Sequence, residues 1–157
     1  MDRLAELSLP EDILALATIN GMECLWPVDC IPEVIEAMRD ADLVNMGGHL
    51  QFRLKGCGIC ECYWIDVDTH QARSTVLPWR ECVDRTADIA FARYSSLRSA
   101  YDFLQEGQRV FSWLFADYER LGRDPADAMY FVWHAASEVT QSRLPSPRFW
   151  QTERSDG

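Results

Sequence analysis

The stretch Met46–Asp68 reads MGGHLQFRLKGCGICECYWIDVD, and its alternation of polar and apolar residues is the strongest structural signal in the chain. Leu50, Phe52 and Leu54 recur at every second position, which is the period of a half-buried strand. A second alternating run follows, so residues 48–66 predict a β-hairpin with Gly56-Cys57-Gly58 as its turn. The expected register pairs Leu54 with Cys60, Phe52 with Cys62, Leu50 with Trp64, Arg53 with Glu61 and Gln51 with Tyr63.

The residues before this hairpin predict two helices. Pro10-Glu11-Asp12 begins an apolar helical pattern that stops at Asn20-Gly21, and Pro32 begins a second helix. The inner face of the second helix consists of Ile31, Val34, Ile35 and Met38. Met22–Val28, between the two helices, fits an edge strand or a buried loop.

The residues after the hairpin predict further helices. A long apolar stripe with helical spacing follows Pro78, and Gly107 should interrupt it. The next stripe ends at Gly122, which is a suitable helix terminator. Asp124 as N-cap and Pro125 at the first helical position predict a third helix. Its buried side would comprise Met129, Val132, Trp133, Ala136 and Val139, with His134 and Glu138 one turn apart on its polar side.

The order of these elements predicts an α+β fold. A small antiparallel sheet, built on the central hairpin at about residues 48–66, would pack against N-terminal helices and a C-terminal helical bundle. We expect residues 1–144 to form a single α+β domain, because this length supports one core. Residues 145–157 lack periodicity and predict an irregular C-terminal tail.

The charge of the chain restricts its partners. The sequence has 25 Asp and Glu against 15 Lys and Arg, a formal net charge of −10. Such a surface repels nucleic acid and anionic membranes, so a basic protein is the natural partner. The N-terminal sequence MDRLAELSLPED has no apolar run after a basic segment, and no stretch approaches the roughly 20 apolar residues of a membrane span. We therefore expect a cytoplasmic protein.

Two groups of residues could bind a metal ion. Cys57, Cys60 and Cys62 include a Cys-x-x-Cys pair, but no second such pair or His pair completes a zinc site. The expected hairpin also turns two of these thiols toward its apolar face, where a cysteine acts as a small hydrophobe. We therefore expect reduced, packed cysteines.

The second possible metal site is Asp66, Asp68 and His70, whose spacing places three ligands on one side of a strand end. It could bind a divalent cation, or it could be the polar exit of the sheet, since the glycine and distal glutamate of a calcium loop are absent. We expect no metal and no cofactor.

Signatures of catalysis are scarce. The sequence contains no Gly-x-Ser-x-Gly elbow, no phosphate-binding Gly-x-x-x-x-Gly-Lys and no His-Glu-x-x-His. We therefore expect a protein that is not an enzyme and has no catalytic residues. A small metal-binding protein or metal-dependent enzyme, using either group of possible ligands, remains the alternative.

Five short segments between Leu25 and Asp68 point to a known class of protein. They are Leu25-Trp26-Pro27, Ile31–Met38, Asp42-Leu43-Val44, Gly47–Arg53 and Tyr63-Trp64. In these segments the chain resembles small bacterial immunity proteins, the cytoplasmic antidotes of polymorphic and contact-dependent growth-inhibition toxins. The resemblance implies a protein without catalytic activity that binds a toxin domain tightly and blocks it.

Acidic residues in this region give the expected partner-binding surface. Glu61, Asp66 and Asp68 should lie on the outer face and exit of the hairpin, beside Tyr63. A second group, on the exposed side of the Pro32 helix, comprises Glu33, Glu36 and Asp40. A toxin nuclease needs a basic cleft for its substrate, so an acidic ridge with an aromatic centre could occlude that cleft.

Overall fold

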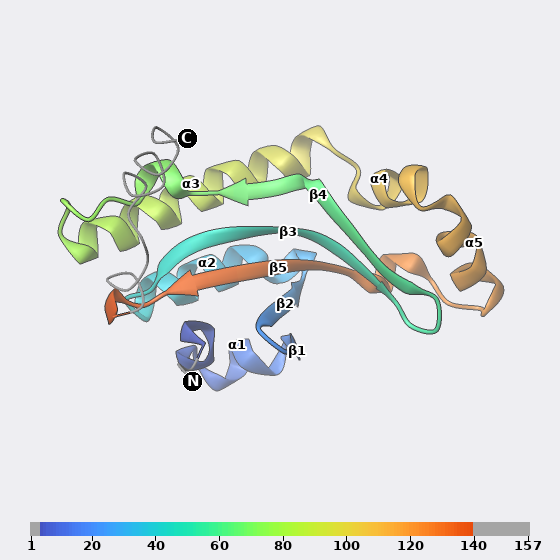
Figure 1. Ribbon diagram of the computed structural model, residues 1–157, viewed down its shortest axis with the longest axis horizontal. Coiled ribbons are helices and arrows are strands. Elements are labelled where there is room, and N and C mark those ends of the chain that lie inside the picture. The colour runs from blue at the N-terminus through green and yellow to red at the C-terminus, as the bar shows by residue number, and fades with distance from the viewer. Residues whose placement is uncertain (1–3, 140–157) are drawn as a thin grey trace, which may run out of the picture.

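The computed structural model describes residues 4–139 and has an α+β fold, as the sequence predicts. Its centre is a five-stranded antiparallel sheet with strand order β1-β2-β5-β3-β4 (Figure 1). The strands are β1 (Thr18–Asn20), β2 (Glu23–Pro27), β3 (Val44–Leu54), β4 (Gly58–Asp68) and β5 (Met129–Ala136). The helices are α1 (Glu11–Ala15), α2 (Ile31–Asp40), α3 (Trp79–Ala100), α4 (Phe103–Val110) and α5 (Ser112–Arg120). Single 3-10 turns are η1 (Ala5–Ser8), η2 (Val28–Cys30), η3 (His70–Ala72) and η4 (Pro125–Ala128).

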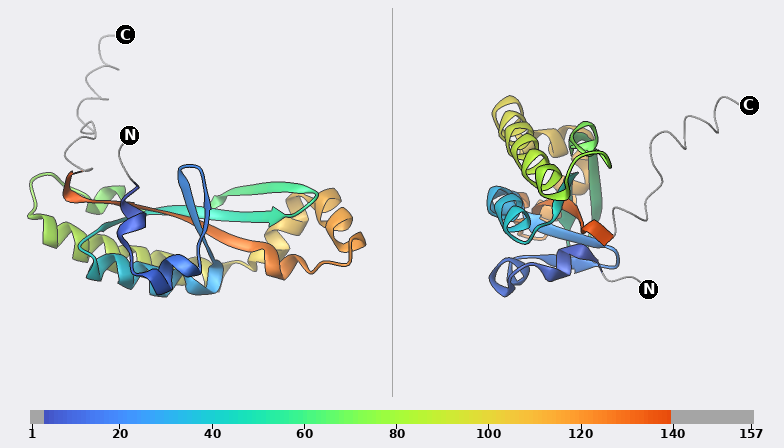
Figure 2. Two further views of the ribbon diagram at one scale, coloured as in Figure 1. Left: turned by 90° about the horizontal axis from the view of Figure 1, so that it is seen from below. Right: turned by 90° about the vertical axis from the view of Figure 1, so that its left-hand side faces the viewer.

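The sheet has one face covered by long helices. Figure 2 shows α2 and α3 side by side on the same side of the strands, while the β1–β2 hairpin rises on the other side. We call the side away from α2 and α3 the open face. Within residues 4–139, no helix is long and apolar enough to cross a membrane. The predicted tail, residues 145–157, and the last residues of the predicted domain lie outside the described part of the chain.

The predictions for the first third are partly confirmed. The Pro32 helix is α2, and its predicted inner face is fully buried. The first helix is shorter than predicted, because α1 ends at Ala15 and Thr18–Asn20 forms β1. Residues 23–27 form β2, which pairs with β1 on one side and β5 on the other and is therefore no edge strand.

The helix predicted after Asp124 is wrong. Asp124 does cap a turn, since its carboxylate accepts a hydrogen bond from the Ala126 N–H, but that turn is the single-turn η4. The next residues form β5, the strand at the centre of the sheet. A strand with neighbours on both sides and both faces buried shows no alternation, so its apolar run fits a helical spacing equally well. The C-terminal helical bundle is therefore limited to α3, α4 and α5.

The positions of the helix breaks also differ from the prediction. The long stripe after Pro78 forms α3, which ends at Ala100, and Gly107 lies inside α4 instead of between helices. Gly122 follows α5 with a φ of 78°, so the predicted terminator is confirmed.

The central hairpin has the predicted faces in a different register. Leu54 pairs with Gly58, Phe52 with Cys60 and Leu50 with Cys62, a slip of two residues from the expected pairs. Because side chains alternate with period two, this slip keeps Leu50, Phe52, Leu54, Cys60 and Cys62 on the inner face. The turn is Lys55-Gly56-Cys57, closed by a 2.8 Å hydrogen bond from the Cys57 N–H to the Leu54 carbonyl.

Candidate functional site on the open face of the sheet

A bulge in β4 shapes the open face. Leu50 pairs with Cys62, but the preceding residue, His49, pairs with Asp66, so three residues of β4 lack a partner on β3. These residues are Tyr63, Trp64 and Ile65. The strand bends in this region (Figure 1). Bulges of this kind re-aim side chains and are frequent next to functional sites.

The bulge changes which residue of this segment is buried. Ile65 turns into the core and is fully buried, whereas Tyr63 is 66% exposed and Trp64 is 38% exposed. The predicted burial of Trp64 opposite Leu50 is therefore wrong. The Trp64 indole N–H instead donates to Glu106 Oε1 of α4 at 3.3 Å. Two aromatic side chains are consequently displayed on the surface next to one another in sequence.

A chain of hydrogen bonds connects the polar residues of the open face. Glu61 accepts from Gln51 Nε2 at 2.6 Å through Oε1 and contacts His49 Nε2 through Oε2. Gln51 Oε1 in turn accepts from an Arg53 guanidinium N–H at 3.0 Å. The predicted pairing of Arg53 with Glu61 is wrong, because the two-residue slip places Gln51 opposite Glu61. For the same reason Gln51 does not pair with Tyr63.

The burial of Gln51 makes this set of hydrogen bonds rigid. Gln51 is 1% exposed, so its amide depends on protein partners, and it has one at each end. The ring of His49 also packs against Tyr63, with 4.8 Å between ring centroids. Glu61, His49 and Tyr63 are thus held in one arrangement before any partner arrives.

A groove of about 330 Å³ lies beside this chain of hydrogen bonds. Its polar and aromatic lining consists of His49, Tyr63, Asp66, Asp68 and His134, and Met46, Gly47, Gly48 and Val67 complete it. A Cβ on Gly48 would lie 1.6 Å from the Val132 carbonyl oxygen, so β3 can approach β5 this closely only with glycine there. His134 was not predicted as a site residue because the spacing of its apolar neighbours fits a helix. The aromatic and β-branched content of residues 129–136 is the signal that could have placed it on a strand.

The two acidic residues of the groove differ in whether they already have a partner within the protein. Asp68 accepts a 2.8 Å hydrogen bond from the His70 backbone N–H, and Arg73 lies 3.7 Å from the same oxygen. Asp66 is exposed and makes no ion pair within residues 4–139. Asp66 is therefore the carboxylate of this groove that is available to a partner.

The second predicted acidic group lies on the other side of the sheet. Glu33, Glu36 and Asp40 are exposed on α2, which covers the face opposite to the groove (Figure 2). Arg39 lies 3.4 Å from Glu36 and also pairs with two carboxylates of α3. The structure therefore separates the two groups of acids that the sequence suggested as one surface.

The possible metal ligands do not converge. Among residues 4–139, no group of three or more His, Cys, Asp and Glu side chains could hold a metal ion. His70 begins η3, and its recorded contact with Asp68 is through the backbone N–H.

The cysteine group is divided between the core and the turn. Cys60 and Cys62 are fully buried on the inner face, and Cys57 lies in the turn. Burial raises the pKa of Cys60 to about 11 and that of Cys62 to about 12, so both are neutral thiols near pH 7. All six cysteines have free thiols.

The contact between His49 and Glu61 resembles the base and orienting carboxylate of hydrolases. Such a pair acts on an adjacent hydroxyl or thiol nucleophile. In the described part of the chain, the side chains in contact with His49 are those of Glu61 and Tyr63, and neither is a serine, threonine or cysteine. The geometry therefore fits a fixed polar surface better than a catalytic triad.

Comparison of the chain with protein-family models, with curated proteins and with solved structures finds no match.

Proposed function

We propose that this protein is an immunity protein, which binds a cognate bacterial toxin domain in the cytoplasm and neutralises it without catalysis. The observation that carries the proposal is the β4 bulge, which holds Tyr63 and Trp64 on the surface between Glu61 and Asp66. Exposed aromatic side chains are the residues that most often dominate binding energy at protein interfaces. The resemblance of Leu25–Asp68 to immunity proteins supports the same function.

The charge of the protein supports a basic partner. The chain carries a formal net charge of −10, and Asp66 extends this charge to the rim of the groove without an ion pair inside the described residues. Nucleases bind a polyanion and carry basic clefts. A toxin domain of this class would be attracted to the open face before contact.

The rigidity of the open face supports tight binding. Ordering side chains at an interface costs about 0.5–1.5 kcal/mol for each long side chain. Here the hydrogen bonds through Gln51 already fix Glu61, and the ring contact with His49 restrains Tyr63. Binding therefore costs little further free energy for ordering these side chains.

Of the two acidic surfaces, the open face is the better candidate. The large apolar side chains that are exposed within residues 4–139 include Tyr63 and Trp64 but none from α2. On α2, moreover, Arg39 offsets part of the negative charge. We therefore assign Glu61, Tyr63 and Asp66 of the open face to the interface, with Trp64 at its margin because the indole reaches Glu106 of α4. The acids of α2 serve as the comparison surface.

The test is the binding kinetics of the purified protein with the toxin domain encoded beside its gene. The double substitution Tyr63→Ala with Trp64→Ala should speed dissociation by about 30-fold or more, because a hot-spot residue contributes about 2 kcal/mol or more. Asp66→Lys should slow association by about tenfold at low salt, and the effect should shrink as salt screens it.

The matched control is Glu33→Lys, which makes the same charge change on α2. It should leave association nearly unchanged. Equal slowing by Asp66→Lys and Glu33→Lys would indicate a general charge effect and remove the open face from the proposal. Failure of the unaltered protein to bind the toxin domain and to protect cells that express it would reject the immunity function itself.

A further inference from the structure

Cationic side chains gather at the turn end of the central hairpin. Five Arg and Lys side chains make no ion pair within residues 4–139, namely Arg53, Lys55, Arg85, Arg93 and Arg123. Two of them belong to α3. The other three meet where the β3–β4 turn approaches the loop after α5, since Arg123 donates to the Lys55 carbonyl at 2.9 Å.

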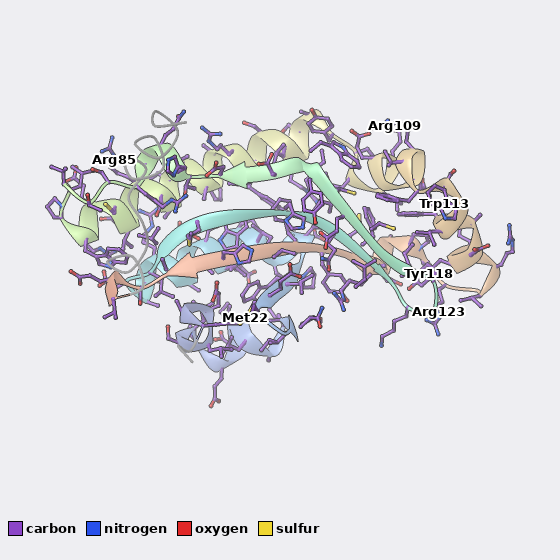
Figure 3. The ribbon with its side chains drawn as sticks, in the orientation of Figure 1. Met22, Arg85, Arg109, Trp113, Tyr118 and Arg123 are labelled. Atoms are coloured by element: carbon purple, nitrogen blue, oxygen red, sulfur yellow. The ribbon has the colours of Figure 1, made fainter. Side chains whose placement is uncertain are left out.

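Arg53 and Lys55 line a pocket of about 450 Å³, which we call the turn pocket. Its polar lining consists of Arg53, Lys55, Tyr118, Asp127 and Tyr130. Arg123 is not part of this lining, but its guanidinium lies 5.9 Å from the centre of the ring of Tyr118, and the two residues are neighbours at one end of the molecule (Figure 3). Two cations therefore line the pocket with one carboxylate, and a third cation lies beside one of the lining tyrosines, in a protein whose overall charge is strongly negative.

The tyrosines of the turn pocket have free hydroxyl groups. The hydroxyl groups of Tyr118 and Tyr130 make no hydrogen bond to any described residue, and both oxygens are accessible to solvent although Tyr118 as a whole is 7% exposed. Because both residues line the pocket, their O–H donors are available to a group bound inside it.

We propose that the turn pocket binds the oxyanion group, phosphate or carboxylate, of a small molecule. Guanidinium and ammonium groups form charge-assisted hydrogen bonds with such oxygens, and tyrosine hydroxyls add neutral donors. The volume lies in the usual range of small-molecule pockets, about 300–1,000 Å³, so it accommodates more than the anion alone. Ile59, which is 48% exposed, supplies an apolar wall for the remainder of the ligand. This inference does not depend on toxin binding.

The test is titration of the full chain with inorganic phosphate and, separately, with succinate, followed by NMR of the arginine side-chain N–H groups and by thermal unfolding. We expect saturable binding with a dissociation constant of about 1 mM or tighter for at least one of them. At about 10 mM ligand this should raise the unfolding midpoint by a few degrees. The anion that saturates identifies whether the site recognises phosphate or carboxylate.

Matched variants separate the turn pocket from general salt effects, because phosphate stabilises folded proteins without a site. Lys55→Gln with Arg123→Gln should abolish saturation, and Tyr118→Phe should weaken binding severalfold. Arg85→Gln with Arg93→Gln makes the same charge change on α3, with Arg85 at the opposite end of the molecule (Figure 3), and should bind normally. Absence of saturation with both anions, or an equal response of both double variants, would overturn the proposal.

Discussion

Gly107 of α4 lies directly against the ring of Phe52 in β3. A Cβ on Gly107 would stand 2.5 Å from Cε2 of Phe52 and 2.8 Å from Cζ of Phe115, far inside normal contact distance. The two rings are themselves packed edge to face, with 5.0 Å between their centroids. This glycine is therefore required by close packing of a helix on the sheet, although the sequence suggested a helix break.

Gly107→Ala should destabilise the protein by about 1–3 kcal/mol, measured by urea unfolding. Alanine is favoured over glycine in a helix interior by about 1 kcal/mol, but overpacking two buried aromatic rings costs more. Gln105→Ala, at an exposed position of the same helix, should change stability by less than about 0.5 kcal/mol. Phe52→Leu should partly relieve the clash in the double variant, and a more stable Gly107→Ala protein would contradict the packing.

Substitutions at the β4 bulge should reveal which side chain belongs to the core. Ile65→Ala should lower the free energy of unfolding by about 2–5 kcal/mol, because it opens a cavity at a fully buried position. Trp64→Ala should cost only about 1 kcal/mol, since the indole is partly exposed and forms one surface hydrogen bond. A larger loss of unfolding free energy for Trp64→Ala than for Ile65→Ala would indicate that β4 follows the regular register without a bulge.

Removal of the Glu61 carboxylate should destabilise the protein, because the buried amide of Gln51 donates a hydrogen bond to it. Glu61→Ala leaves the buried Gln51 Nε2 without its acceptor, which should cost about 1–3 kcal/mol in equilibrium unfolding. Glu61→Gln retains an acceptor oxygen and should cost less. In a Gln51→Leu background the effect of Glu61→Ala should decrease, and equal losses in both backgrounds would show that the two residues are not coupled.

Stability should fall at alkaline pH because of the buried thiols. The pKa of Cys62 is raised by burial from 9.0 to about 12, and that of Cys60 to about 11. Below pH 9 both thiols are protonated in the folded and unfolded chains, so they add no pH dependence. Above pH 9 the unfolded chain releases these protons while the folded chain retains them. The free energy of unfolding should then fall by about 1 kcal/mol per pH unit for each thiol.

Urea unfolding at pH 8 and pH 10, in the presence of reductant, measures this effect. Cys62→Ala should be less stable at pH 8, because it opens a small cavity, but should lose less stability on going to pH 10. Cys57→Ala, in the turn, should show the full pH dependence of the unaltered protein. An identical decrease in all three proteins would assign the alkaline loss to other groups.

The alternation in Met46–Asp68 predicted which side chains face the core but could not specify the pairing. A slip of two residues preserves both faces, so Leu50 can lie opposite Cys62 or Trp64 with the same pattern. The bulge could not be predicted from the sequence for a related reason. Tyr63, Trp64 and Ile65 are all suited to a strand, and only contacts distant in the sequence determine which of them turns inward.

The candidate site was predicted in part. Glu61 and Tyr63 do lie on the open face, where the hairpin pattern placed them. Asp66 was expected at the exit of the hairpin, and the bulge brings it beside Tyr63 in the groove. His134 was missed because β5 is buried on both faces, and a uniformly apolar run does not distinguish a strand from a helix. The burial of Gln51 could not be predicted either, since it depends on Glu61 and Arg53 satisfying both ends of its amide.

The central position of β5 has a consequence for synthesis of the chain on the ribosome. About 75 residues separate the end of β3 from the start of β5, an interval of about 4–15 s at about 5–20 residues per second. During that interval β2 and β3 have no partner along the edges that β5 later joins, and unpaired edges invite pairing with other chains. The nascent protein therefore passes through a stage in which four of its five strands are present as two separate pairs, β1 with β2 and β3 with β4. Chaperone binding should be strongest on ribosome-bound chains arrested just before Met129 and should decline once β5 has emerged from the exit tunnel.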